Sequence, residues 1–129
     1  MEKFLKHKAI NYHDLPYSGE HESVHDLTHK KAWGKLGKQV IKEIALKNNW
    51  DFIAEHNPSG DIDRGYVSGF FESNNRNKFV YFSISDGMQD ILFRTAKHST
   101  DYTGGSNNNA NISKGGFEKM VAFIDNYFN

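Results

Sequence analysis

The spacing of apolar residues along the chain predicts two amphipathic helices with a run of strands between them. From about His29 to Asn48, the apolar positions fall within an arc of roughly 80° when residues are placed at 100° each: Trp33, Leu36, Val40 and Ile44. The last residues repeat this periodicity at Phe117, Met120, Val121, Ile124 and Phe128. Both patterns are typical of helices that bury one face against a core.

Four short segments between these helices have the composition of β-strands: Trp50–His56, Tyr66–Glu72, Lys78–Ser85 and Asp90–Ala96. The third segment alternates and should place two sets of residues on opposite faces, with Val80, Phe82 and Ile84 on one and Phe79 and Tyr81 on the other. An Asn-rich turn at 74–77 and the pair Asp86-Gly87 join neighbouring segments. Such tight turns favour antiparallel pairing of consecutive strands.

These elements predict a single α+β domain over residues 1–129. An antiparallel sheet of about four strands should be flanked by an N-terminal amphipathic helix and a C-terminal helix, in the order α-β-β-β-β-α, with both helices on one face. Residues 1–20 should form a tail or an irregular lead-in, and residues 97–116 a long polar loop. Val24 and Leu27 would point away from the apolar stripe of a continuous helix, so a break or a separate short helix is expected before about Lys30.

The composition supports one globular domain and excludes several kinds of function. With 129 residues, 14% of them aromatic, the chain can build one core. It has no cysteine, which excludes disulfides, cysteine-based zinc sites and a cysteine nucleophile. Sixteen basic residues balance sixteen acidic ones, which argues against a strongly cationic nucleic-acid binder. Because no long apolar run is present, we expect a soluble, cytoplasmic protein that does not engage membranes.

Lysines gather on the first predicted helix, on the side opposite its apolar stripe. Four of them fall within roughly 60° of one another at 100° per residue: Lys31, Lys35, Lys38 and Lys42. A solvated helix face is one interpretation, and a surface for phosphates or for an acidic partner is the other. Gly34 and Gly37 each lower helix propensity by roughly 1 kcal/mol relative to Ala, and they would let another element approach closely.

A second group of basic residues lies near the ends of the predicted strands: Arg64, Arg94, Lys97 and His98. Antiparallel pairing would bring the strand ends together, with Asp61, Asp63 and Asp101 available as counter-charges. These groups form either a closed ion-pair network or a surface whose guanidinium groups grip a carboxylate or phosphate. We expect the second arrangement and include all four basic residues in a binding surface.

The sequence His-Glu-Ser-Val-His, which begins at His21, matches the H-E-x-x-H motif of zinc hydrolases. On a helix, His21 and His25 face the same way and can ligate zinc, while Glu22 takes a proton from the bound water. His29 or His13 would be the third ligand. The lysine-rich helix face that follows in the sequence disfavours a bound cation, so we expect no metal, no cofactor and no catalysis. The alternative is a small zinc hydrolase.

Three segments resemble small accessory proteins of phages and conjugative elements of low-GC Gram-positive bacteria: Gly60–Tyr66, Phe79–Asp86, and Phe93–His98 with Asp101–Asn107. The order of helix, curled sheet and helix is also similar to some anti-CRISPR proteins of such phages. The resemblance covers about residues 48–110 and implies a non-enzymatic, anti-defence role. We therefore expect binding to a host protein or a protein–nucleic acid complex. A third possibility is an RNA or single-strand binder in which Phe79 or Tyr81 stacks bases.

Overall fold

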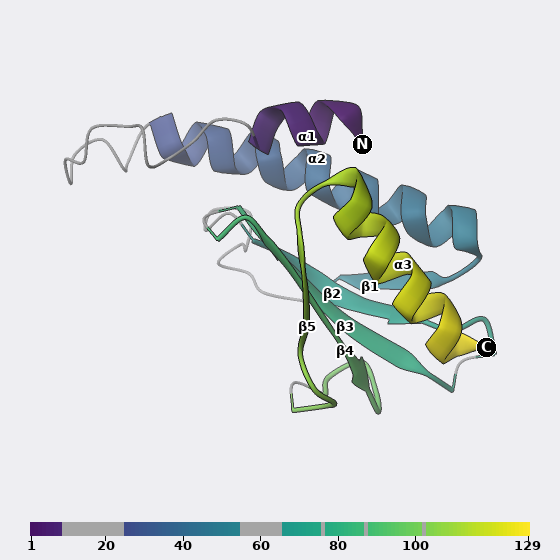
Figure 1. The fold of residues 1–129 in the computed structure, drawn as a ribbon. Coiled ribbons are helices and arrows are strands. Elements are labelled where there is room, and N and C mark those ends of the chain that lie inside the picture. Colours follow the sequence, from purple (N-terminus) through teal and green to yellow (C-terminus); the bar gives the residue numbers. More distant parts are fainter. Residues whose placement is uncertain (9–24, 55–65, 76, 87, 102) are drawn as a thin grey trace.

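Within the residues that the structure describes, five strands form one antiparallel sheet, and helices pack against it (Figure 1). This computed structural model describes residues 1–8, 25–54, 66–75, 77–86, 88–101 and 103–129, with the backbone alone at residues 8, 25–30 and 54. The helices are α1 Glu2–Lys8, α2 His25–Asn48 and α3 Lys114–Phe128. The strands are β1 Asp51–Ala54, β2 Tyr66–Glu72, β3 Phe79–Ser85, β4 Asp90–Ala96 and β5 Asn108–Asn111.

The sheet is a meander in which each strand pairs with the next one along the chain, in the order β1-β2-β3-β4-β5. The register places Val80 opposite Phe71, Phe82 opposite Phe93, and Ile84 opposite Ile91, so these residues share one face. All of them are buried. The predicted α+β fold, with an antiparallel sheet and helices at both ends, is confirmed.

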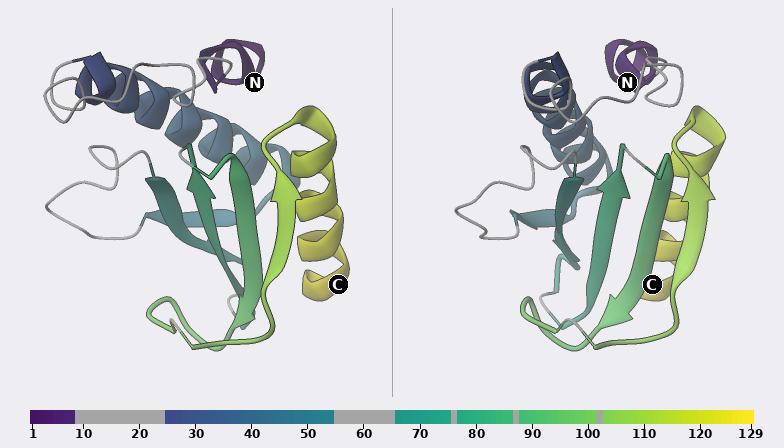
Figure 2. Two further views of the ribbon diagram at one scale, coloured as in Figure 1. Left: turned by 60° about the vertical axis from the view of Figure 1, so that its left-hand side comes forward. Right: turned by 90° about the vertical axis from the view of Figure 1, so that its left-hand side faces the viewer.

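Helices α2 and α3 cover the same face of the sheet, one over each half (Figure 2). Helix α2 lies against β1 and β2, and α3 lies against β4 and β5. Their buried side chains join the core with those of the inner sheet face; α2 contributes Trp33, Val40, Ile41 and Ile44, and α3 contributes Phe117, Met120 and Ile124. The opposite face of the sheet is called the outer face below.

An irregular lead-in is predicted over residues 1–20, but Glu2–Lys8 forms helix α1. Its Phe4 is 1% exposed and packs against Trp33, with ring centroids 5.1 Å apart. A Cβ atom on Gly37 would lie 3.0 Å from the Phe4 ring, so the expected close approach of another element at this glycine is confirmed. Two adjacent apolar residues, Phe4 and Leu5, in a helix of seven residues give too weak a period to be recognised in the sequence.

Two further expectations require correction. The long polar loop predicted over residues 97–116 contains strand β5, which pairs with β4 from Phe93↔Asn108 to Asp90↔Asn111. Asn disfavours strands, so local preference did not indicate this element, and pairing with β4 stabilises it. The break predicted before about Lys30 is also wrong, because α2 is continuous from His25. The predicted first strand, Trp50–His56, begins at Asp51, and residues 55–56 lie outside the described part.

Candidate functional site

Helix α2 turns its lysines away from the sheet, as the periodicity predicts. Lys31, Lys35 and Lys42 are exposed and Lys38 is half-buried. Leu46, one turn beyond Lys42, is 84% exposed. We call these outward-facing residues of α2 the lysine face: Lys31, Lys35, Lys38, Lys42 and Leu46.

The charges of the lysine face are not neutralised within the described part of the chain. None of its four lysines forms an ion pair with a described residue; the ion pair found there joins Lys6 to Glu2 on α1, at 3.7 Å. Lys31 and Lys35 are four residues apart on the helix, as are Lys38 and Lys42. Like charges at this spacing destabilise a helix by about 0.2–0.5 kcal/mol per pair. The face is therefore a concentrated positive surface with an apolar residue at one end.

Arg94 lies on the outer face of the sheet, where a row of paired residues crosses four strands: Ile53, Phe70, Tyr81 and Arg94. Its guanidinium carbon is 4.4 Å from the centroid of the Tyr81 ring. Its Nη1 donates to the side-chain oxygen of Asn107 at 3.5 Å. Lys97 and His98, at the end of β4, are exposed. Arg64, the fourth predicted member of this surface, lies outside the described residues.

Asp101, one of the three carboxylates available as counter-charges to the basic residues, binds backbone N–H groups near the end of β4 instead. Its carboxylate accepts hydrogen bonds from the backbone N–H groups of Lys97, at 2.9 Å, and Thr103, at 3.0 Å. These donors, the Lys97 N–H first, hold the pKa of Asp101 below its ordinary value. Asp101 therefore shapes the loop after β4. Asp61 and Asp63 fall outside the described part of the chain.

Two alternatives to a protein-binding surface are a zinc hydrolase and a nucleic-acid binder that stacks bases. His21 and Glu22 lie outside the described residues, and only the backbone of His25 and His29 is described, so the zinc motif remains a prediction. Across the described ranges, no three His, Asp or Glu residues could hold a metal together. For base stacking, Arg94 packs over one face of Tyr81, so a nucleobase on that face would have to displace the guanidinium. Phe79 is half-buried.

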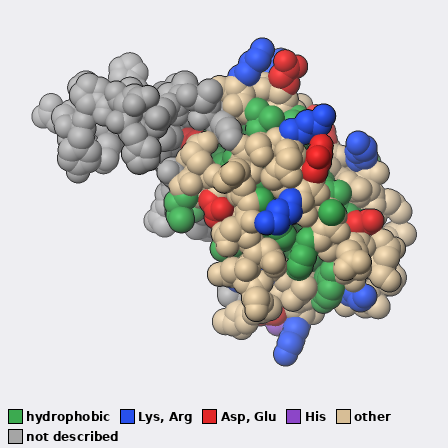
Figure 3. Space-filling view, viewed as in Figure 1, with side chains coloured by type: hydrophobic (Ala, Val, Ile, Leu, Met, Phe, Trp, Pro, Cys, Tyr) green, Lys and Arg blue, Asp and Glu red, His purple; other side chains and the backbone are tan. Residues whose placement is uncertain are grey.

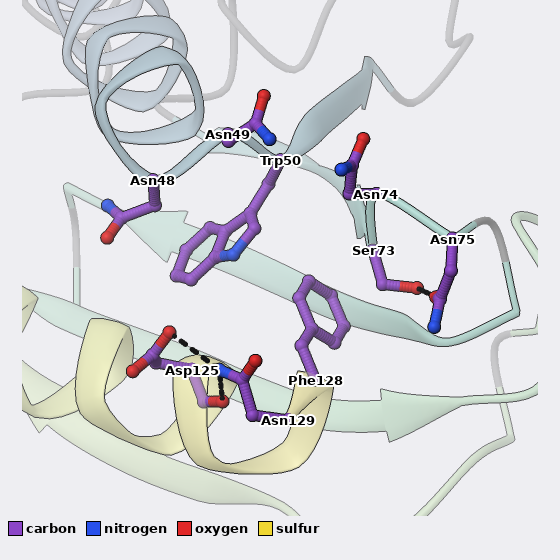
Figure 4. Close-up of a pocket in the computed structure, with 9 residues that line it drawn as sticks. All are labelled: Asn48, Asn49, Trp50, Ser73, Asn74, Asn75, Asp125, Phe128 and Asn129. Atoms are coloured by element: carbon purple, nitrogen blue, oxygen red, sulfur yellow. Dashed lines mark hydrogen bonds between the residues drawn. The ribbon is translucent and has the colours of Figure 1, made fainter.

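A polar pocket lies where the end of α2, the β2–β3 turn and the end of α3 meet (Figure 4). Its volume is about 330 Å³. Carboxamides form much of its wall: Asn48, Asn49, Asn74, Asn75 and Asn129. Trp50, Phe128, Ser73 and Asp125 complete the lining. We call this cavity the Asn pocket. The sequence predicts none of its residues as binding residues.

The end of α2 fixes the aromatic part of the Asn pocket. Asn49 adopts a left-handed conformation with φ of 60°, which Asn tolerates better than most residues. The next N–H, of Trp50, donates to the Ala45 carbonyl at 2.9 Å and closes the helix. This turn places the Trp50 ring edge to face with Phe128 and with Phe71, at centroid distances of 5.5 Å in both cases. The indole is therefore held in one orientation at the pocket.

The sequence contains one signal that relates to the Asn pocket, the Asn-Asn pairs at 48–49 and 74–75. Each pair indicates a turn. What it does not indicate is that the two turns meet each other and the last turn of α3, since the three segments are far apart in the chain. Only the packed fold brings them together.

A second, apolar groove of about 420 Å³ runs between α2 and α3 and adjoins the Asn pocket at Asn48 and Asp125. Ile44, Phe117 and Val121 line it, with Lys47 and Glu118 beside them. On the face of the molecule seen in Figure 3, apolar side chains reach the surface between interspersed basic and acidic ones. This mixed surface contrasts with the lysine face, where all four charges have the same sign.

No helix among the described residues has both the length and the apolar character needed to cross a membrane. Family models, curated proteins and solved structures provide no match to this chain. What the protein does is therefore inferred from the lysine face, the outer face of the sheet and the Asn pocket.

Proposed function

We propose that this protein is a non-enzymatic binding protein whose lysine face docks on an acidic surface of a host protein, alone or within a protein–nucleic acid complex. The observation that carries the proposal is the row of lysines on α2 that no described carboxylate neutralises. An accessory, anti-defence role in a phage or mobile element is part of the proposal and rests on the resemblance of residues 48–110.

Repulsion between the lysines of the lysine face lowers the stability of α2 in the isolated protein, and an acidic partner would relieve it. Two pairs of like charges four residues apart each destabilise α2 slightly. A partner with carboxylates at matching positions removes this repulsion and accelerates association, because complementary charges steer the encounter. Leu46 lies at one end of the row, where a partner would cover its exposed side chain.

An acidic protein surface fits the lysine face better than bare duplex DNA or RNA does. The affinity of a protein for a duplex rises with the number of phosphates that it neutralises. Here the formal net charge of the chain is zero, and four lysines spread over roughly 17 Å of helix are few for that purpose. An exposed Leu beside the charges also suits a protein partner, since apolar contacts form the centre of most protein interfaces.

The test compares two charge-reversed variants that carry the same net charge. In the first, Lys31, Lys35, Lys38 and Lys42 are changed to Glu. In the control, four exposed lysines elsewhere are changed to Glu: Lys3, Lys6, Lys114 and Lys119. Each protein is immobilised and exposed to nuclease-treated host lysate in low salt, and the retained proteins are identified by mass spectrometry and then purified for direct binding measurements.

The proposal expects an acidic partner that the unchanged protein and the control both retain and the α2 variant loses. Direct binding should weaken as salt rises, because the Debye length falls from about 10 Å at 0.1 M to 3 Å at 1 M. Equal loss in both variants would show that only net charge matters. Full retention by the α2 variant would return the lysine face to an ordinary solvated surface.

A further inference from the structure

We propose that the Asn pocket binds a neutral sugar ring through adjacent hydroxyl groups. The pocket shares no residue with the lysine face, so this inference stands apart from the proposed function. It rests on three features of the lining: the hydrogen-bonding state of its carboxamides, its charge, and the fixed aromatic edge of Trp50.

Hydrogen bonds within the protein commit some atoms of the pocket and leave the complementary ones for a ligand. Asn48 donates its amide to the Ile44 carbonyl at 2.9 Å, and Asn129 donates to the carbonyl and carboxylate of Asp125 at 2.8 and 3.0 Å. Their side-chain oxygens remain as acceptors. Asn75 does the opposite: its oxygen accepts from the Ser73 hydroxyl at 2.7 Å, which leaves its N–H groups as donors.

Two further donors lie in the same lining. Among described residues, neither the Asn74 carboxamide nor the Trp50 indole N–H has a hydrogen-bond partner. The lining therefore combines acceptors from the ends of α2 and α3 with donors from the β2–β3 turn and from Trp50, at the end of α2 (Figure 4). A hydroxyl group donates one hydrogen bond and accepts up to two, so adjacent hydroxyls satisfy such a mixed wall better than a ligand with donors or acceptors alone.

The charge of the lining selects against anions. Among the described residues of the lining, Asp125 is the charged side chain, and no Lys, Arg or His contributes. Phosphate or carboxylate ligands would meet this negative charge without a compensating cation from the described lining, which disfavours them. Carboxamides outnumber the single carboxylate, so hydrogen bonding to a neutral ligand dominates the recognition chemistry.

The size and the aromatic edge point to one or two rings. A volume of about 330 Å³ lies at the lower end of the roughly 300–1,000 Å³ typical of ligand sites. Trp50 is 8% exposed, so it offers its edge and N–H group, and the half-buried Phe128 offers a small apolar surface for the C–H groups of a ring. A ligand of this size in an open pocket should bind with a dissociation constant of about 1 mM.

The test is an NMR titration of the ¹⁵N-labelled protein. The sugar probes are glucose, galactose, mannose and ribose; uridine and 2′-deoxyuridine distinguish a free sugar from the ribose of a nucleoside, and ethylamine probes for a cation site. The indole N–H of Trp50 reports binding. The indole of Trp33, which is 0% exposed in the core, is the internal control.

The matched variants are Asn74→Leu, which removes a donor from the wall, and Asn126→Leu, which changes an exposed Asn of α3 outside the lining. A sugar should shift the Trp50 signal saturably and leave that of Trp33 in place. Asn74→Leu should raise the dissociation constant about threefold to tenfold, as expected for one or two lost hydrogen bonds, while Asn126→Leu leaves it unchanged.

Three results would overturn the proposal. The first is the absence of a saturable Trp50 shift with every sugar and with uridine at roughly fifty times the expected dissociation constant. The second is equal binding of uridine and 2′-deoxyuridine without binding of any sugar, since recognition would then be of the base. The third is tighter binding of ethylamine than of all sugars, since the pocket would then be a cation site.

Discussion

Strands β2 and β3 pair along their whole length, yet they bury their side chains differently. In β3, burial alternates: Val80, Phe82 and Ile84 are buried, and the residues between them are half-buried. In β2, five consecutive residues from 67 to 71 are buried, on both faces. Phe70, on the outer face, is 1% exposed and so is as inaccessible as Phe71 on the inner face.

This difference shows that alternation identifies the two faces of a strand but not how much of each is covered. Antiparallel sheets often bury one face and solvate the other. Here the inner face is buried beneath α2 and α3, whereas the outer face carries the Phe70, Tyr81 and Arg94 row. Substitutions on each face can measure how far the outer row contributes to stability.

The largest loss of stability is expected for a substitution at the centre of the inner face. Phe82→Ala should lower the free energy of unfolding by about 3–5 kcal/mol, because the ring is fully buried and stacks on Phe71 at 4.8 Å. Urea denaturation monitored by circular dichroism measures this loss. Leu92→Ala on the outer face, where the side chain is half-buried, should cost about 1 kcal/mol. Equal losses would mean that the two faces are equally covered at these positions.

The second-largest loss of stability is expected when the side chain that holds α1 in place is shortened. Phe4→Ala should cost about 3 kcal/mol, the lower end of the range for buried Phe, because α1 can detach while the sheet stays folded. Amide hydrogen exchange should then accelerate in α1 and stay slow in β2 and β3. Lys3→Ala, an exposed neighbour, is the control and should change neither. Uniform acceleration throughout the protein would show that α1 unfolds only with the whole domain.

A smaller effect is expected for the Tyr81–Arg94 contact on the outer face. A double-mutant cycle with Tyr81→Leu and Arg94→Met should give a coupling energy of about 0.5–1 kcal/mol, the size of a partly exposed cation–π interaction. Thermal or chemical unfolding of the four proteins supplies the numbers. A loss of about 3–5 kcal/mol from Arg94→Met alone would instead indicate the closed ion-pair network that the sequence leaves open.

The smallest effect is a pH dependence at Asp101. Its pKa is lower in the folded protein than in the unfolded chain, so its contribution is complete above the unfolded pKa and disappears as the pH falls through the folded pKa. Asp101→Asn should therefore lower Tm at neutral pH, and the difference from the unchanged protein should shrink below about pH 4. Melting curves between pH 7 and pH 2 measure it. A difference that is constant over this range would contradict the assignment.

Much of the fold follows from periodicity, which is a local property. The 3.6-residue period of α2 gives both its buried stripe and the opposite lysines, and the alternation of β3 gives its two faces correctly. Antiparallel pairing of β2 with β3 and of β3 with β4 follows from the short turns between them. These features depend on residues that are near one another in the chain, so the sequence determined them.

Other features were decided only by tertiary structure. Strand β5 consists of Asn108, Asn109, Ala110 and Asn111, residues that form a strand here because β4 offers a free edge beside them. Helix α1 is held by the insertion of Phe4 against Trp33 and Gly37, contacts that no local pattern encodes.

The same distinction separates the two candidate sites. The lysine face lies on one helix, so its side of α2 follows from the sequence. The Asn pocket joins the end of α2, the β2–β3 turn and the end of α3. Each Asn by itself indicates only a turn or a polar helix end, because hydrogen-bonding groups gain a common function only when packing brings them within reach of one ligand. That convergence depends on how the helices pack on the sheet, and the sequence alone did not show it.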